Sequence, residues 1–214
     1  MPGPTQADLV RVLVAEGIRD ERVLAAFRRV PRAAFVPPGR IEEAYVDVPL
    51  PIPHGQVTTQ PSLVARMLEA LELTGGERVL EVGTGYGFQT ALLARLAATV
   101  WSVERFADLA AFARAALAGQ GVRNASVVIG DGSRGLPEEA PFDAVVVAAA
   151  YPSVPEPLAG QLSADGRLVQ PLGPGGSEEV VLFASSAGGL ARRCVVTGAH
   201  FVRLYGEHGF EAGP

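Results

Sequence analysis

Apolar residues in the first thirty positions recur every three or four residues, which is the spacing of one face of an α-helix. One such face is formed by Leu9, Val12 and Leu13, and a second by Val23, Leu24 and Phe27. Gly17 lies between the two faces, so the pattern predicts two helices over residues 5–30. A third apolar stripe over residues 63–71 predicts another helix that begins at Pro61, because proline lacks an N–H group that a first helical position would leave unpaired.

The segment of residues 31–60 has no such period. It is rich in proline and includes the run VPLPIPHGQ, so it is predicted to be irregular. Loops of this length are uncommon in compact domains and are usually functional. We therefore expect this segment to lie over another part of the fold and to contribute to a site.

Short β-branched runs alternate with helical segments from residue 78 onwards. The runs are RVLEVG, TVWSVE, ASVVIG, FDAVVVAA and GRLVQPLG; the helical segments are FQTALLARLAA, ADLAAFARAALAGQ and a shorter one near PEPLAGQL. Apolar strands separated by helices are typical of a parallel sheet covered on both faces. The final runs EEVVLFASS and LARRCVVTGAHFVRL, joined by a turn, predict an antiparallel finish. We expect a single α/β domain over residues 1–214, with a doubly wound, Rossmann-like sheet: residues 1–60 provide helices and the loop, and residues 61–214 the core.

The composition excludes several classes of protein. The net charge of −5 and the absence of a basic run argue against nucleic acid as a partner. The chain has no lysine, which excludes Schiff-base chemistry and a P-loop nucleotide site. Its three scattered histidines and one cysteine argue against a metal site, and we expect Cys194 to be a small buried hydrophobe. With no secretory signal, no apolar run long enough for a membrane span and no possible internal disulfide, a cytoplasmic location is expected.

The strongest local motif is VLEVGTGYGFQTALLA, residues 79–94. A predicted strand that contains Glu81 ends there, a turn with glycines at 83, 85 and 87 follows, and a helix begins. Glycines in such a turn let backbone N–H groups approach a ligand at the positive end of a helix. The dinucleotide pattern GxGxxG needs a glycine at the position of Phe88, so the motif fits a nucleoside-methionine cofactor better than NAD.

Acidic residues also end the next two predicted strands. The run WSVER places Glu104 where a carboxylate can accept hydrogen bonds from both ribose hydroxyls, with Arg105 beside it. The run GDG places Asp131 where it can accept from an adenine amino group, and Gly132 where the ring can approach closely. Because open α/β sheets bind ligands at the carboxyl ends of their strands, the three motifs together predict a nucleoside site.

The order of these motifs resembles the protein-L-isoaspartate O-methyltransferases over about residues 20–205. The resemblance rests on RVPRAAFVP, AYVDVPLPI, HGQVTTQP, the glycine turn, VER, GDG, APFDAVVVAAA and GRLVQPLG. It implies a methyltransferase fold, S-adenosylmethionine as cofactor, S-adenosylhomocysteine as product, and isoaspartyl peptides or unfolded protein segments as substrates. We expect the chain to be a monomer. Thr59 stands where the family normally carries its active-site serine.

The residues assigned to the site combine the motifs with this resemblance. Thr59 is the catalytic candidate, although a threonine ahead of Pro61 could instead cap the helix. Arg203, where the family usually has proline, could pair with a substrate carboxylate or face solvent. The expected cofactor-binding residues are Val57, Thr58, Glu81, Gly83, Thr84, Gly85, Glu104, Arg105, Asp131 and Gly132, and the expected substrate-binding residues are His54, Gln56, Phe201 and Val202.

The predicted reaction is methylation of the α-carboxylate of an isoaspartyl residue, which starts repair through a succinimide. A carboxylate with a pKa of about 3.9 is ionised at neutral pH and needs no general base. Three alternatives remain open from the sequence: a methyltransferase that tailors a peptide natural product, a binding protein that has lost catalysis, and an NAD-linked oxidoreductase.

Overall fold

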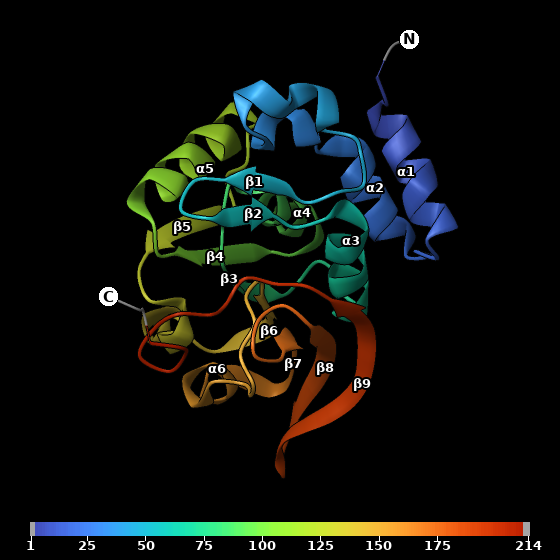
Figure 1. Cartoon of the computed structure of the whole chain (residues 1–214). Coiled ribbons are helices and arrows are strands. Elements are labelled where there is room, and N and C mark those ends of the chain that lie inside the picture. The colour runs from blue at the N-terminus through green and yellow to red at the C-terminus, as the bar shows by residue number, and fades with distance from the viewer. Residues whose placement is uncertain (1–2, 212–214) are drawn as a thin grey trace.

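A computed structural model describes residues 3–211 of the chain (Figure 1). The helices are α1 (Gln6–Ala15), α2 (Glu21–Arg29), α3 (Pro61–Ala70), α4 (Phe88–Leu96), α5 (Ala107–Gly119) and α6 (Glu156–Gly160), with short 3₁₀ helices at Arg32–Phe35, Pro38–Glu43, Gly132–Arg134 and Pro137–Glu139. The strands are β1 (Leu50–Ile52), β2 (Gln56–Thr58), β3 (Arg78–Val82), β4 (Thr99–Glu104), β5 (Ala125–Ile129), β6 (Phe142–Val147), β7 (Leu162–Leu172), β8 (Glu178–Ser186) and β9 (Gly189–Ala199).

The seven later strands form one sheet in the order β5-β4-β3-β6-β7-β8-β9. The pairs from β5 to β7 are parallel, and β8 and β9 are antiparallel to their neighbours. Strands β3 and β4 are adjacent and β6 lies on the other side of β3, so the strand order reverses there. This confirms the predicted doubly wound sheet with an antiparallel finish, and it brings the carboxyl ends of β3, β4, β5 and β6 to one edge.

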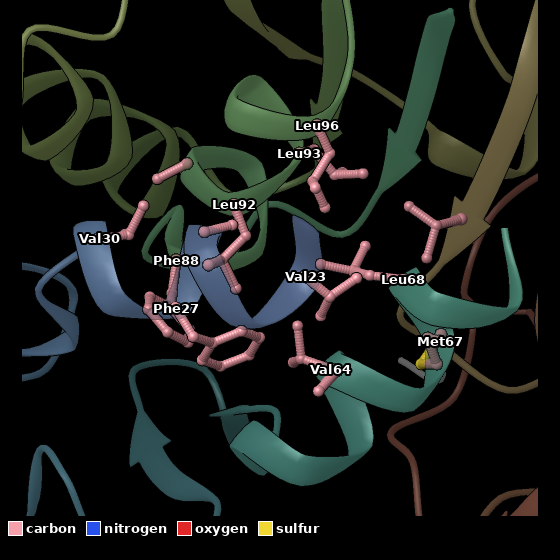
Figure 2. Close-up of a cluster of buried hydrophobic side chains, with 14 of the residues drawn as sticks. Val23, Phe27, Val30, Val64, Met67, Leu68, Phe88, Leu92, Leu93 and Leu96 are labelled. Atoms are coloured by element: carbon pink, nitrogen blue, oxygen red, sulfur yellow. The ribbon is translucent and has the colours of Figure 1, made fainter. Parts of the chain in front are cut away.

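Alternate residues of the central strands face two separate cores. Val79, Ala144 and Val146 belong to the larger core, together with residues of α1 to α5. Figure 2 shows part of that core, where apolar side chains of α2, α3 and α4 meet. Leu80 and Val145 point to the opposite face, where the smaller core includes a buried leucine of α6. The sheet is therefore covered on both faces, as continuous apolar strands require.

Capping residues explain where the first two helices begin. Thr5 and Asp8 form a reciprocal capping box at the start of α1, and the side chain of Asp20 accepts from two backbone N–H groups at the start of α2. The break between the helices lies at Gly17, which has a φ of 97°. Both helices and the helix beginning at Pro61 were predicted correctly.

Three sequence predictions need correction. Residues 31–60 are not irregular throughout, because two 3₁₀ helices precede the antiparallel pair β1–β2. Pro51 is tolerated in β1 because this strand belongs to a separate two-stranded ribbon and Pro51 faces outward. The final strand ends at Ala199 rather than continuing to Leu204. Cys194 is exposed rather than buried, because β9 is an edge strand whose residues are mostly exposed.

Within residues 3–211, every helix is too short or too polar to cross a membrane.

Candidate active site

An open cavity lies at the carboxyl ends of the central strands. The loops after β3, β4, β5 and β6 line it from below, and β1 and β2 cover it as a two-stranded flap. The segment after β9 closes another side with Val202, Arg203, Leu204 and Tyr205. The cavity thus lies at the reversal of strand order, where open α/β sheets bind their ligands.

Glu104 and the glycine turn are joined directly at the floor of this cavity. One carboxylate oxygen of Glu104 accepts from the Gly85 N–H at 2.9 Å, and the other accepts from the Phe106 N–H at 3.0 Å. Gly85 has a φ of 53°, a conformation that favours glycine. The Glu104 residue is 5% exposed and lines the cavity. Its carboxylate is held by the two N–H groups, while further lone pairs remain for a ligand.

The residues Asp131 and Gly132 of the GDG turn have different roles. Gly132 lines the cavity, and a Cβ at this position would lie 2.5 Å from Cγ1 of Val82, so only glycine fits without movement. Asp131 does not line the cavity. Its carboxylate accepts from Ser133 N at 2.9 Å and from Glu207 N at 2.7 Å. Burial favours the neutral form, but these hydrogen bonds outweigh it and lower the pKa of Asp131. Its predicted contact with adenine stays a prediction.

Glu81 lies beneath the glycine turn rather than in the cavity. It is fully buried and accepts hydrogen bonds from Gln89 Nε2 at 3.0 Å, from Ser102 Oγ at 2.6 Å and from the hydroxyl of Thr90. Ser102 in turn pairs with Thr84 of the turn at 2.5 Å. Burial raises the pKa of Glu81 to about 7, against the lowering effect of its three donors. Glu81 therefore supports the turn and α4 from below.

The raised pKa of Glu81 predicts a pH-dependent stability. Below about pH 4.5 the carboxyl is protonated in both states, whereas between about 4.5 and 7 only the unfolded chain loses the proton. The free energy of unfolding should therefore fall as the pH rises through this window, by roughly 3 kcal/mol for a shift of this size. Urea unfolding at pH 5 and pH 7.5 measures the fall. A Glu81→Gln variant, which cannot ionise, should show a smaller fall, and equal falls would contradict the prediction.

A second open cavity forms a groove between α3 and the end of β9. Its lining includes Gln60, Ser62 and Arg66 on one side and residues 197–202 on the other. The groove and the first cavity share four lining residues, which are Val57, Thr59, Ala148 and Val202. The two spaces therefore meet beside Thr59. This is the central geometric feature of the site.

Most of the predicted site residues lie at these two cavities. Gln56, Val57, Thr58, Thr59, Gly83, Thr84, Gly85, Glu104, Arg105, Gly132 and Val202 line the first, and Phe201 lines the groove. Helix α3 is capped at Gln60, so Thr59 is not its capping residue.

His54 lies at neither cavity. Its ring stacks on Phe106 with a centroid distance of 4.1 Å, and its Nε2 lies 2.9 Å from the Asp108 carboxylate. This hydrogen bond is the largest cause of a lowered pKa for Asp108. His54 therefore joins the turn of the flap to the beginning of α5. Its predicted contact with substrate remains a prediction.

Several lining residues escaped the sequence analysis. Phe106 lies two residues after Glu104 and was within reach of the strand-end argument. Tyr205 carried no such signal, because its position depends on how the chain leaves β9. The Arg105 guanidinium lies 4.9 Å from the Phe106 ring centre and 5.1 Å from that of Tyr205, which joins the two walls.

Arg203 lines the first cavity, is exposed, and contacts two other segments. Its Nε donates to the Pro174 carbonyl at 2.9 Å, and its guanidinium lies 5.0 Å from the Phe210 ring centre. Among the described residues 3–211, no group of three or more histidine, cysteine or acidic side chains is placed to hold a metal ion.

Comparison with known proteins gives a consistent result. The family model for protein-L-isoaspartate(D-aspartate) O-methyltransferase matches residues 4–209. A protein-L-isoaspartate O-methyltransferase of Methanoculleus marisnigri is 50% identical over 197 residues, which are 92% of this chain and 89% of the relative. One of Anaeromyxobacter dehalogenans is 58% identical over 166 residues, 77% of this chain and 79% of the relative.

Solved structures agree with the sequence comparison. A protein-L-isoaspartate O-methyltransferase structure aligns with a TM-score of 0.83 and 27% identity, covering 96% of this chain and 67% of the other. A Plasmodium falciparum protein crystallised in complex with S-adenosyl-L-homocysteine aligns with a TM-score of 0.80 at 22% identity, covering 94% and 99%. The latter likeness concerns the fold.

Proposed function

The chain belongs to the protein-L-isoaspartate(D-aspartate) O-methyltransferase family, and we propose that it methylates the α-carboxylate of L-isoaspartyl residues with S-adenosylmethionine. The observation that carries the proposal is the meeting of two cavities beside Thr59. A group transfer needs donor and acceptor in separate sites with one shared boundary, because the reacting atoms must lie in line.

The first cavity fits the nucleoside part of the cofactor. Glu104 offers a fixed carboxylate to ribose hydroxyls, and Gly132 provides a place for close approach because a Cβ there would meet Val82. The turn of Gly83, Thr84 and Gly85 would hold the remainder near the start of α4. When bound, the sulfonium cofactor supplies an activated methyl group and a good leaving group.

The groove would hold the substrate backbone. Residues 197–202 continue from the edge strand β9, and an extended peptide can lie along such a segment. The isoaspartyl carboxylate would then point through the shared boundary, where the Thr59 hydroxyl can donate a hydrogen bond to it. The residues of the chain need only hold this anion in line and partly exclude water, because a carboxylate is already ionised at neutral pH.

The proposed product explains why no further group is needed for repair. A carboxylate has no good leaving group, whereas its methyl ester can lose methanol. The following backbone nitrogen can therefore attack the ester carbonyl, form the ring C–N bond and release methanol. The resulting succinimide hydrolyses in part to normal aspartate. The proposed substrates are therefore exposed, flexible segments that carry the damaged residue. A monomer in a reducing compartment completes the proposal, in keeping with the single cysteine.

Transfer of a labelled methyl group from S-adenosylmethionine to a matched pair of peptides tests the function. One peptide carries isoaspartate and the other aspartate at the same position. We expect label only in the isoaspartyl peptide, released slowly as methanol while the succinimide forms. Equal labelling of both peptides, or of neither although the cofactor binds, would overturn the proposal.

A further inference from the structure

Thr59 itself is held only through its neighbours. Its side chain makes no hydrogen bond within residues 3–211, whereas Thr58 and Gln60 are both hydrogen-bonded to other elements. We propose that Arg32 and Asp47 are positioning residues for methyl transfer, which fix Thr59 at the boundary of the two cavities from either side. This inference rests on the proposed function, because it presumes that Thr59 contacts the reacting carboxylate.

Arg32 holds Thr58, the residue that precedes Thr59, through a hydrogen bond. It is 1% exposed, and its Nη2 donates to the Thr58 hydroxyl oxygen at 3.2 Å. Its other hydrogen bonds all go to one short segment, namely to the carbonyls of Ala44 at 3.2 Å, Val46 at 2.8 Å and Val48 at 2.9 Å. A buried guanidinium without an ion pair is costly, so its retention here needs a reason. Burial lowers the pKa of Arg32 to about 10, and the nearby charge of Asp47 acts in the opposite direction.

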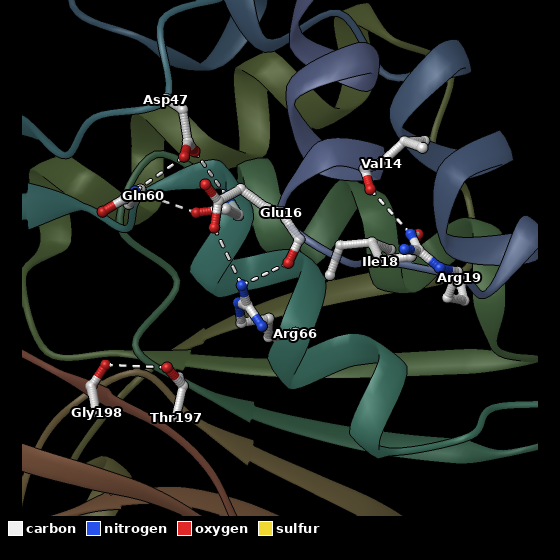
Figure 3. A network of polar contacts seen from close by, with 10 residues as sticks. Val14, Glu16, Ile18, Arg19, Asp47, Gln60, Arg66, Thr197 and Gly198 are labelled. Atoms are coloured by element: carbon white, nitrogen blue, oxygen red, sulfur yellow. Dashed lines mark hydrogen bonds and ion pairs between the residues drawn. The ribbon is translucent and has the colours of Figure 1, made fainter.

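Asp47 holds Gln60, the residue that follows Thr59, through a hydrogen bond. One carboxylate oxygen accepts from the Ser62 N–H at 2.8 Å. The other accepts from Gln60 Nε2 at 2.9 Å, a contact drawn in Figure 3. Gln60 is the capping position of α3 but makes no side-chain cap of its own. Asp47 therefore caps this helix from a distant part of the chain. Its negative charge is stabilised by the positive end of the helix dipole.

Both contacts lead to the same short segment, residues 44–48. Asp47 lies within residues 44–48, the segment whose carbonyls Arg32 holds. Thr58 is thus connected to residues 44–48 through Arg32, and Gln60 through the Asp47 side chain, with Thr59 between them. The Thr58 hydroxyl oxygen also accepts from the Leu50 N–H at 3.2 Å, which ties it to β1. A shift of about 1 Å in a reacting geometry can cost on the order of 100-fold in rate, so even partial release of this segment should reduce kcat.

The test is a double-mutant cycle between Asp47 and Thr59, with kcat for the isoaspartyl peptide as readout. Asp47→Ala should lower kcat by roughly 10-fold or more, with little change in cofactor affinity. Asp47→Asn keeps an oxygen that can accept from Ser62 N and should restore most of kcat. In a Thr59→Val background, Asp47→Ala should have little further effect on kcat, because the group being positioned is already gone.

Glu77→Ala provides the matched control. Glu77 accepts from the N–H groups of Thr74 and Gly75, both at 2.8 Å, but precedes β3 at the edge of the sheet opposite the cavities. The Glu77→Ala variant should be less stable than the wild type but should keep the same kcat. Arg32→Lys probes the other contact, since one ammonium cannot reach four acceptors; it should lower kcat if it folds, and a failure to fold leaves the decision to the Asp47 cycle.

Three results of these experiments would contradict the inference, and a fourth would refute the proposed function. Losses of kcat that multiply in the double variant would mean that Asp47 does not act through Thr59. An Asp47→Ala effect confined to stability, or matched by Glu77→Ala, would reduce Asp47 to a structural cap. A wild-type chain that does not methylate the isoaspartyl peptide would instead refute the proposed function, which keeps the two failures distinct.

Discussion

Replacing Glu104 by alanine should weaken S-adenosylmethionine binding by about 100-fold, or about 2.7 kcal/mol. The Glu104 residue is 5% exposed and its carboxylate is held by the N–H groups of Gly85 and Phe106, so it is ready to accept from a ligand without rearrangement. Hydrogen bonds to a charged group contribute about 1.5–3 kcal/mol each, and two ribose hydroxyls are the proposed donors. Alanine would also free the Gly85 N–H and loosen the turn. Titration calorimetry with S-adenosylhomocysteine measures the loss.

Two variants separate the ribose contact from the effect on the turn. Glu104→Gln keeps one acceptor oxygen and the shape of the side chain, so its loss should be intermediate. Glu179→Ala removes an exposed glutamate of β8 that pairs with Arg192 at 2.7 Å, and it should leave the affinity unchanged. Glu104→Ala binding within about threefold of the wild type would sink the assignment of Glu104.

The sequence predicted the elements around the cavity well because their signals are local. An apolar strand, a glycine turn and a helical stripe are each encoded within some fifteen residues, as in the segment from Val79 to Ala94. The carboxyl ends of consecutive parallel strands must lie at one edge of a sheet. Sequence alone therefore sufficed to assign Gly85, Glu104 and Gly132 to one cavity.

The remaining features depend on contacts between distant segments. The strands β1 and β2 are three residues each, so their pairing across the turn of residues 53–55 left no periodic pattern. The carboxylate of Asp131 is taken by Ser133 and by Glu207, and the latter is 76 residues away. Cys194 lies in an apolar run yet is exposed, because strand periodicity does not reveal which strand forms the edge of a sheet.

The location of Glu81 could not be predicted from the sequence either, although Glu81 belongs to a recognisable motif. Its position in the strand before a glycine turn suggested a cofactor contact. Whether Glu81 is buried depends on the face of β3 to which its side chain points. Here it points toward α4, where Gln89 and Thr90 donate hydrogen bonds to it. A residue can thus belong to a cofactor motif and act on the turn from beneath.

Replacing Thr59 by valine should lower kcat for the isoaspartyl peptide by about 10- to 100-fold. Valine keeps the branched shape at the boundary of the two cavities and removes only the hydroxyl. A hydrogen bond to a carboxylate contributes about 1.5–3 kcal/mol, and it acts on the rate to the extent that it holds the attacking oxygen in line. Cofactor affinity should change little, because the carboxylate of Glu104 remains. Single-turnover transfer of a labelled methyl group measures the step directly.

Thr59→Ser removes only the methyl group, giving the serine that the family resemblance predicts at this position. The hydroxyl remains, so activity within about threefold of the wild type is expected if threonine is a tolerated replacement. A large gain with serine would instead mean that the extra methyl group obstructs the boundary between cavity and groove. Equal rates for valine, serine and threonine would remove the hydroxyl from the reaction, leaving alignment to the backbone of the flap and to the surfaces of Ala148 and Val202.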